Sequence, residues 1–348
     1  MPKLSSDKLL RIGTLLFETA GAPHDAAATV AGSLVASNLA GHDSHGISHV
    51  VGYIKKVLDG GLDPRAKPQI VTESPTTALV DAKLGFGKIA ADFAMELLIK
   101  KTLAMKVASV GIRNCFHIGR LGQYVERAVE ANIIAMVTLC GGGAGTSTTP
   151  YGGAGKTLGT NPYAFGIPAG KQPPLIVDFA TTQVAGGKIG VARDKGQRVP
   201  EGWLVKKDGS PTTDPNDFFQ GGMLTTMGQH KGFGLSMVAE ALGGALTGST
   251  FFKKDDNPGN NVFMWGVATD AFIPSAEYAE REDASIAKIR ATPPAVGFKE
   301  VLIPGDPERR TRAERERSGI EVPDQTWKEI RALAEKLGVA AKVDAIAS

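Results

Sequence analysis

Apolar residues recur every three or four positions near both ends of the chain, which predicts amphipathic helices there. Residues 5–58 carry three such helices. Ser5 and Ser6 are candidate N-caps of the first. The second ends at Gly41, a residue type that favours helix C-termini. We expect Ser44 to cap the third, with His45 in its first turn. About the last 40 residues are again helical.

The middle of the chain alternates short apolar runs with helical segments. Strands are predicted at 77–81, 107–113, 133–139, 175–179 and 262–268, and helices at 90–103, 121–131 and 231–247. A loop rich in glycine and threonine extends from residue 139 to about residue 162. This order predicts an α/β (α+β) fold with two domains. One is a mainly helical, discontinuous domain of residues 1–75 plus 295–348, and the other is an α/β domain of residues 76–294.

The composition is that of a water-soluble globular protein, with 42% hydrophobic and 22% charged residues. A net charge of +3 gives no reason to expect nucleic acid or membranes as partners. The first residues lack the apolar core of a signal peptide, and two cysteines are too few for a disulfide framework. We therefore expect a cytoplasmic protein with reduced thiols.

Three of the six histidines, His42, His45 and His49, lie within eight residues. Histidine titrates near neutral pH, so such a cluster is typical of proton transfer. Spacings of three and four can also align metal ligands on a helix. However, Gly41 and Ser44 place the helix start after His42, and no cysteine stands nearby. We predict no metal, and a metal hydrolase is the most distant alternative.

Two nucleotide-binding patterns are incomplete. Residues 85–90 match the G-x-G-x-x-G/A fingerprint, but no acidic residue stands between Glu96 and Glu126 to bind a ribose. We interpret these glycines as a turn that packs a helix against a strand. Gly155-Lys156-Thr157 resembles a P-loop end, but Pro150 occupies the position of its first glycine, and no helix follows.

Three other segments combine chemistry with a favourable position. His117 lies in a turn between a predicted strand and helix, where catalytic groups are often held. Asp178 follows three apolar strand residues, and a buried carboxylate needs a partner, such as a histidine that it orients. Lys231 follows His230 at a helix start, which favours anions. Each residue also has a purely structural interpretation. His117 could be a core histidine bonded to the backbone, Asp178 a buried cap of the next loop, and Lys231 a solvated residue of a first helical turn.

With residues 43–46, these segments resemble the non-Rossmann malate/L-lactate dehydrogenase family, and the match covers nearly the whole chain. The family motifs Asp-Ser-His-Gly, Gly-Thr-Asn-Pro and His-Lys-Gly stand at residues 43–46, 159–162 and 230–232. Three more match with one change each: Asn-Ser-x-His-x-Gly has Cys115 for Ser, Asp-x-Ala-Thr-Ser ends in Thr182, and Pro-Gly-Glu has Asp306 for Glu. Residues 40–47 and 117–120 are similar to the hydroxycarboxylate dehydrogenase B branch.

The resemblance implies an NAD(P)-dependent oxidoreductase that interconverts 2-oxo acids and 2-hydroxy acids as a homodimer. Its fold is a mixed, largely antiparallel, nicotinamide-binding sheet. The catalytic residues implied are His117, His45 and Asp178. The cofactor-binding residues implied are His45, Gly119, Arg120, Leu121, Ile176, Val177, Asp178, Phe179, Ala180, His230, Lys231, Asn261, Gly305, Asp306, Pro307 and Glu308. The substrate-binding residues implied are Ser44, His49, Arg120 and Asn161.

Hydride delivery to a ketone leaves an alkoxide that needs a proton, and either His117 or His45 fits that role. His49 stands where many family members have an arginine that would bind the substrate carboxylate. Imidazole cannot bind a carboxylate bidentately. Arg120 or backbone donors then replace that arginine, or the substrate is a bulkier 2-oxo acid, aromatic ones included.

The cofactor and the reaction leave alternatives open. The resembling branch favours NAD, while Lys188, Arg193 and Lys195 are candidates to bind the 2′-phosphate of NADP. A cyclic-imine (pyrroline- or piperideine-2-carboxylate) reductase uses the same scaffold, with the proton going to nitrogen. A non-catalytic ligand-binding oligomer is the alternative from another class, and the presence of His45, His117, Asp178 and Lys231 argues against it.

Overall fold

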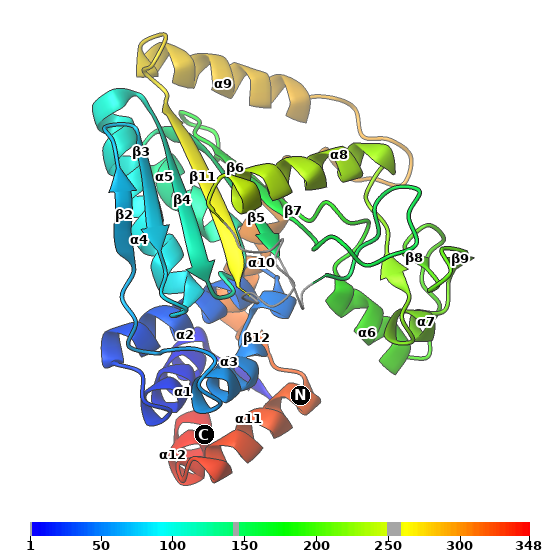
Figure 1. Cartoon of the computed structure of the whole chain (residues 1–348). Helices are drawn as coiled ribbons and strands as arrows, with labels where there is room; N and C mark the ends of the chain where they lie inside the picture. The colour runs from blue at the N-terminus through cyan, green and yellow to red at the C-terminus, as the bar shows by residue number, and fades with distance from the viewer. Residues whose placement is uncertain (1, 142–145, 249–258) are drawn as a thin grey trace.

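The computed structural model describes residues 2–141, 146–248 and 259–348. Figure 1 shows a central sheet with helices on both faces, a helical layer formed by the two ends of the chain, and a small sheet to one side.

The central sheet has seven strands in the order β2-β3-β4-β11-β5-β6-β7. Their bounds are β2 (Gln69–Glu73), β3 (Thr77–Asp81), β4 (Val107–Cys115), β5 (Ile133–Gly141), β6 (Tyr163–Ile167), β7 (Leu175–Phe179) and β11 (Asn260–Ala268). The β3–β4 pair is parallel, and the other neighbouring pairs are antiparallel. The predicted mixed, largely antiparallel sheet is confirmed. Because β2 lies in this sheet, the sheet begins before residue 76; the division into two domains stays a prediction.

Helices α4 (Gly87–Met105) and α5 (Gly122–Glu130) cover one face of the sheet. Their apolar sides share a core with the strands, with Met95, Leu98, Tyr124 and Val125 fully buried. The other face carries α8 (His230–Ala239) and η3 (Glu240–Ala245). The helix predicted at 231–247 is confirmed as a continuous helical run, whose second half, η3, is π-helical. There Gly243 packs so closely on β5 that a Cβ would lie 2.8 Å from the Cys140 nitrogen.

Both ends of the chain build the helical layer. It contains α1 (Ser6–Thr19), α2 (His24–Leu39), η1 (Asp43–His45), α3 (His49–Leu58), α11 (Asp324–Lys336) and α12 (Ala340–Ala347). Ser5 caps α1 as predicted, since its side chain accepts a hydrogen bond from the Lys8 N–H. Strand β1 (Lys3–Leu4) pairs with β12 (Ile320–Glu321), and one hydrophobic core joins residues from both ends.

The remaining elements flank the sheet (Figure 1). A three-stranded sheet of β8 (Leu204–Val205), β9 (Pro211–Thr212) and β10 (Met223–Leu224) packs with α6 (Gly186–Asp194) and α7 (Pro215–Phe219). Helix α9 (Ser275–Arg290) crosses the end of the central sheet, and α10 (Asp306–Ser318) returns the chain to the helical layer.

The predicted capping of α3 by Ser44 is wrong. Residues Asp43–His45 form a single 3-10 turn, and α3 begins only at His49. Gly46 between them is extended and packs against the Asn38 side chain, whose oxygen accepts the Ile47 N–H at 2.8 Å. The Ser44 hydroxyl lies 3.1 Å from the His45 Nδ1.

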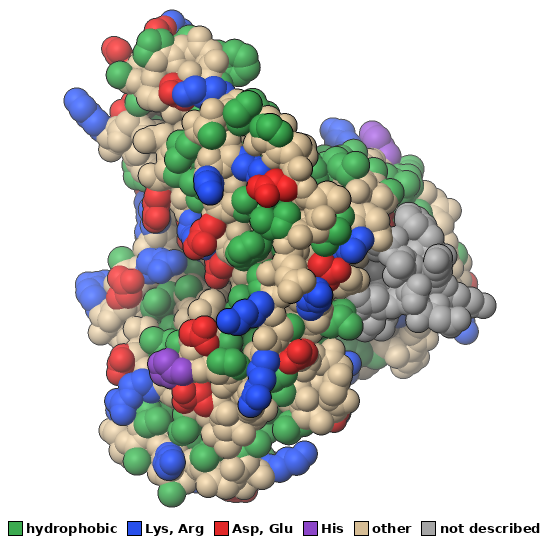
Figure 2. Space-filling view, turned by 60° about the vertical axis from the view of Figure 1, so that its left-hand side comes forward, with side chains coloured by type: hydrophobic (Ala, Val, Ile, Leu, Met, Phe, Trp, Pro, Cys, Tyr) green, Lys and Arg blue, Asp and Glu red, His purple; other side chains and the backbone are tan. Residues whose placement is uncertain are grey.

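The surface carries both charge signs. Figure 2 shows acidic and basic side chains interspersed over one face of the molecule, as the small net charge leads one to expect. Within the described residues, no helix combines the length and the apolar character needed to cross a membrane.

The turn before α4 explains the incomplete dinucleotide fingerprint, because its glycines serve close packing. A Cβ on Gly87 would lie 1.9 Å from the carbonyl oxygen of Phe116. Helix α4 therefore starts directly against the turn that carries His117, as the packing interpretation of these glycines expects.

Replacing Gly87 by alanine tests this contact. We expect Gly87→Ala to lower the free energy of unfolding by about 1–3 kcal/mol, because the neighbour that must move is backbone. Gly52→Ala on α3 is the control. Nothing lies within 4 Å of its added Cβ, and the lost backbone freedom should stabilise the helix by roughly 0.5–1 kcal/mol. Urea unfolding of both variants measures the difference, and equal effects would contradict the packing argument.

Candidate functional site

Four segments that are distant in the sequence meet between the sheet and the helical layer. The Gly122 N–H donates to Asp178 Oδ2 on β7 at 2.7 Å. The Ile176 N–H donates to the Pro304 carbonyl, which joins β7 to the segment before α10. The His42 Nε2 lies 3.3 Å from Glu308 Oε1. These contacts bring together the predicted site segments around residues 42–45, 117–122, 176–180 and 304–308.

An aromatic cluster forms the centre of the site. The His117 ring lies 5.8 Å from that of His45 and 4.9 Å from that of His49, measured between centroids. The Tyr53 hydroxyl is 2.5 Å from the His117 Nδ1. Tyr53 and His49 share one face of α3 because they are four residues apart. The cluster therefore depends on α3 and on the turn after β4.

The hydrogen bonds orient the imidazoles. A carbonyl oxygen only accepts, so the 2.8 Å contact between the His49 Nε2 and the Ser44 carbonyl places a proton on that nitrogen. Tyr53 is 4% exposed, and its hydroxyl occupies the Nδ1 of His117. The Nε2 is then the nitrogen of His117 that remains for a ligand.

The histidines of the cluster are held neutral. Burial first, and then the nearby His49 and His42, lower the pKa of His45 to about 4. Burial also lowers the pKa of His49. For His117, burial first and then the charges of His49 and Lys88 bring the pKa well below its usual range. At neutral pH these rings are unprotonated and able to accept a proton.

Two buried cations lie beside the histidines. Lys88 is fully buried and Arg120 is 2% exposed. The Arg120 Nη2 is 2.5 Å from Glu126 Oε1, while its Nε and Nη1 have no partner within the described residues. Buried guanidinium nitrogens without partners are unusual, and an anionic ligand would satisfy them.

Asp178 lies beside Arg120 and does not contact the His117 Nδ1, which Tyr53 occupies. Burial raises the pKa of Asp178, whereas the Gly122 N–H and the charges of Arg120 and His42 lower it. The charged neighbours of Asp178 are therefore Arg120, His42 and Glu308. Its catalytic role stays a prediction.

The other predicted ligands differ in their surroundings. Burial alone would raise the pKa of Asp306, but hydrogen bonds from Arg290 and Arg309 hold it at about 2. His230 and Lys231 are exposed at the start of α8. Asn261 is 7% exposed and pairs across from Cys140 in the sheet. Their roles toward a cofactor stay predictions.

Asn161 is fully buried and ties the loop before β6 to α8 and η3. Its amide donates to Ser236 Oγ at 2.9 Å and to Glu240 Oε1 at 2.7 Å. Its oxygen accepts the Gly141 N–H at 3.4 Å. None of these hydrogen bonds reaches the histidine cluster, and the substrate role of Asn161 stays a prediction.

Sequence reasoning missed Tyr53 and Lys88. Tyr53 follows His49 by one helical turn on α3, and no motif marks it. Lys88 falls on the same face of α4 as Ala91 and Met95, which are both fully buried. A lysine on an apolar helical face is the signal that would have identified it.

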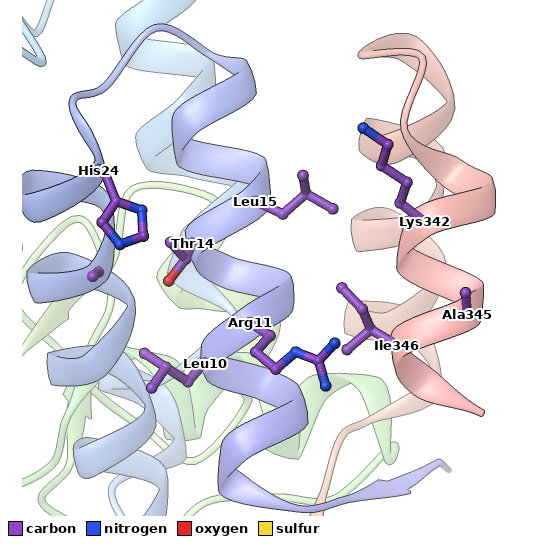
Figure 3. Close-up of a pocket in the computed structure, with 9 residues that line it drawn as sticks. Leu10, Arg11, Thr14, Leu15, His24, Lys342, Ala345 and Ile346 are labelled. Atoms are coloured by element: carbon purple, nitrogen blue, oxygen red, sulfur yellow. The ribbon is translucent and has the colours of Figure 1, made fainter.

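Two cavities differ in their relation to this cluster. A groove of about 590 Å³ lies between α1, α2 and α12, and none of the predicted site residues lines it (Figure 3). A cleft of about 320 Å³ adjoins the site and is lined by Glu126, Val129, Glu130, Pro174, Ile176, Gly305, Glu308, Arg309 and Arg312. The described part of the chain holds no group of three His, Cys, Asp or Glu side chains able to bind a metal.

Comparisons with known proteins agree with this geometry. The family model of malate/L-lactate dehydrogenase matches residues 4–331. Hydroxycarboxylate dehydrogenase B of Escherichia coli (strain K12) is 32% identical, over 93% of this chain and 91% of that protein. A Delta(1)-pyrroline-2-carboxylate/Delta(1)-piperideine-2-carboxylate reductase of Pseudomonas putida is 32% identical, over 93% of each chain. The sulfolactate dehydrogenase structure from Methanocaldococcus jannaschii superposes with a TM-score of 0.89 at 31% identity, covering 98% of each chain.

The lowered pKa values predict how stability depends on pH. As pH falls from about 6.5 to about 4, the unfolded chain protonates His45 and the folded chain does not, so the free energy of unfolding falls. His45→Gln should therefore lose less stability between pH 7 and pH 5 than the wild type, as measured by urea unfolding. Between pH 7 and pH 8 the two proteins should run parallel. If both proteins lost the same stability below pH 6.5, the pKa of His45 would be the same in the folded and the unfolded chain, and the prediction would be wrong.

Proposed function

Because the chain belongs to the malate/L-lactate dehydrogenase family, we propose that it interconverts 2-oxo acids and 2-hydroxy acids with His117 as the acid–base group. The protein is an oxidoreductase that acts on CH–OH groups with a nicotinamide cofactor. The observation that carries the assignment to His117 is its hydrogen bond to Tyr53, which fixes one ring nitrogen and leaves the other for the substrate.

The nicotinamide, when bound, supplies or accepts the hydride. The residues of the chain then have to orient the substrate and move one proton. In the free enzyme His117 is neutral, so it can take the hydroxyl proton of a 2-hydroxy acid. In the reverse direction the negative charge of a 2-oxo acid favours the protonated imidazole, and the Nε2–H can then protonate the substrate oxygen.

Arg120 is the proposed partner of the substrate carboxylate. His49 occupies the position of the family arginine, and its Nε2 is committed to the Ser44 carbonyl. The buried Arg120 offers two nitrogens without partners in the described structure. Its guanidinium would then bind the substrate carboxylate in place of the family arginine. Bulkier 2-oxo acids, aromatic ones included, remain our hypothesis for the substrate.

The residues around the 320 Å³ cleft fit a nicotinamide cofactor. Ile176, Gly305 and Glu308, all expected to bind the cofactor, line it. Glu126, Glu130 and Glu308 place three carboxylates there, which suits ribose hydroxyls and repels a 2′-phosphate. Arg309 and Arg312 also line the cleft. Arg309 is bonded to Asp306 and to the Pro174 carbonyl, and of the three carboxylates Glu126 is bonded to Arg120 and Glu308 contacts His42. These features support NAD rather than NADP.

A cyclic-imine reductase is the second candidate function. The relative from Pseudomonas putida bears that name at the same level of identity as the hydroxycarboxylate dehydrogenase. The same His117 would then protonate a nitrogen instead of an oxygen.

We also propose that the enzyme is a cytoplasmic homodimer. Leu235, Met237 and Val238 form an exposed apolar patch on α8, which a second copy would cover. Both cysteines are buried and free, as expected in a reducing compartment. Light scattering of the purified protein tests the dimer.

Activity measurements test the proposed reaction. With NADH and a panel of 2-oxo acids plus one cyclic imine, we expect turnover of at least one keto acid. His117→Asn should lower kcat/KM by about 10²–10⁴-fold, and Tyr53→Phe by about tenfold through the lost hydrogen bond. Unchanged cofactor binding, followed by NADH fluorescence, controls for folding. A profile that peaks on oxaloacetate would refute the bulky-substrate hypothesis, and turnover only of the imine would favour the second candidate.

Cofactor preference is tested by fluorescence titration with NADH and with NADPH. We expect NADH to bind at least about tenfold more tightly, because one repulsive carboxylate near a phosphate is worth about 1.4 kcal/mol or more. Glu308→Gln should reduce this ratio, whereas Lys188→Gln on α6 should not. Tighter binding of NADPH than of NADH would show that NADP is the preferred cofactor, and Arg312, which lines the cleft, would then be the candidate to bind its 2′-phosphate.

A further inference from the structure

Lys88 is a buried cation that the proposed reaction leaves without a role. Its side chain extends from α4 and is fully buried. The ammonium group donates to Ser33 Oγ on α2 at 2.9 Å. Burying an ammonium group in a protein is unfavourable unless charges or hydrogen bonds compensate for it, so its presence needs a physical reason.

The surroundings of Lys88 compensate its charge only in part. The Ser33 hydroxyl in turn donates a hydrogen bond to Gln123 Oε1 on α5 at 2.6 Å. Asp92, one turn further along α4, is the acidic group that favours the charged lysine. Asp92 is itself bonded to Arg127 at 2.7 Å. Positive charge therefore remains around the ammonium.

The ammonium group touches the turn that carries His117. Gly119 has a φ of +76°, and a Cβ there would lie 2.0 Å from the Lys88 Nζ. The lysine thus supports the backbone two residues beyond His117 and directly before Arg120. Glycine is required at this position for two reasons: the backbone is left-handed, and the Lys88 ammonium occupies the space that a Cβ would need.

We propose that Lys88 is a positioning residue that supports the turn from His117 to Arg120 and whose positive charge keeps His117 unprotonated until an anionic substrate enters. The second part of this inference rests on the proposed function. Lys88 acts through His117 and need not touch the substrate.

The electrostatics agree with this geometry. The groups that face His117 are Tyr53 and His49 on α3, His45 on η1 and Lys88 on α4. After burial and His49, Lys88 is the next cause of the low pKa of His117, and it also lowers the pKa of His45 and of His49.

The charge of Lys88 is itself adjustable. Burial and the nearby Arg120 lower its pKa to about 7, while Asp92 raises it. A substrate carboxylate in the site would favour the charged lysine and the protonated histidine together.

Removing the charge tests the inference in the free enzyme. Lys88→Met keeps an unbranched buried side chain without the charge. The ring signals of His117, assigned with His117→Asn, are followed by NMR against pH. We expect the titration midpoint of His117 to move to higher pH in Lys88→Met. Ser33→Ala should move it in the same direction, because an ammonium that loses its partner is more easily deprotonated.

Lys101→Met is the matched control. Lys101 is the other buried lysine of α4, at 8% exposure, and it is paired with Glu73 at 2.7 Å and with the Ser74 carbonyl at 2.6 Å, away from the histidines. This variant should leave the His117 titration as in the wild type.

The pH profile of kcat/KM for hydroxy acid oxidation gives the second readout. Because oxidation needs a neutral His117, the acidic limb should move to higher pH in Lys88→Met. We expect kcat/KM of Lys88→Met to fall further below that of the wild type as the pH is lowered, with little change at pH 9. A purely structural role would lower the whole profile.

The two proposals fail in different ways. An unchanged His117 titration in folded Lys88→Met and Ser33→Ala overturns the inference, even if His117→Asn abolishes turnover. If no substrate is turned over, the NMR titration still decides the role of Lys88. If Lys88→Met does not fold, Ser33→Ala decides alone.

Discussion

The close packing of α4 against the turn after β4 is the constraint on which the site depends. Gly87 leaves room for the Phe116 carbonyl, and Gly119 leaves room for the Lys88 ammonium. These two contacts fix the backbone on both sides of His117. Tyr53 then fixes its ring from α3. The proposed acid–base group, His117, is therefore held by the sheet, by α4 and by the helical layer at once, which leaves it little freedom to move.

The same packing determines the electrostatics. Three half-buried imidazoles lie close to the buried Lys88 and Arg120, so each one disfavours a positive charge on the others. Groups with shifted pKa values cluster at functional sites, because the binding of a charged ligand can then change the proton affinity of a side chain. An anionic ligand would offset this concentration of positive charge.

Much of the fold followed from the sequence, but not every edge of it. The strands at 133–139 and 175–179 are apolar and lie in the sheet, so their pattern identified them. Strand β2 escaped notice because all five of its residues are exposed. The capping role given to Ser44 was wrong because the contact between Gly46 and Asn38 is tertiary. Local spacing cannot report such a contact.

The candidate site was predictable where motifs carried it and hidden where packing did. His45, His117 and Asp178 came from motifs; the rings of His45 and His117 stack in the structure, and Asp178 lies beside Arg120. Tyr53 and Lys88 came from no motif, since their roles arise from neighbours 64 and 55 residues away in the chain. The central position of β11 has a further consequence, for folding during synthesis on the ribosome. Strands β4 and β5 each keep an open edge until residues 260–268 emerge, so the nascent sheet stays incomplete for more than a hundred residues after β5. Chains that stop before that point would expose two apolar edges to aggregation.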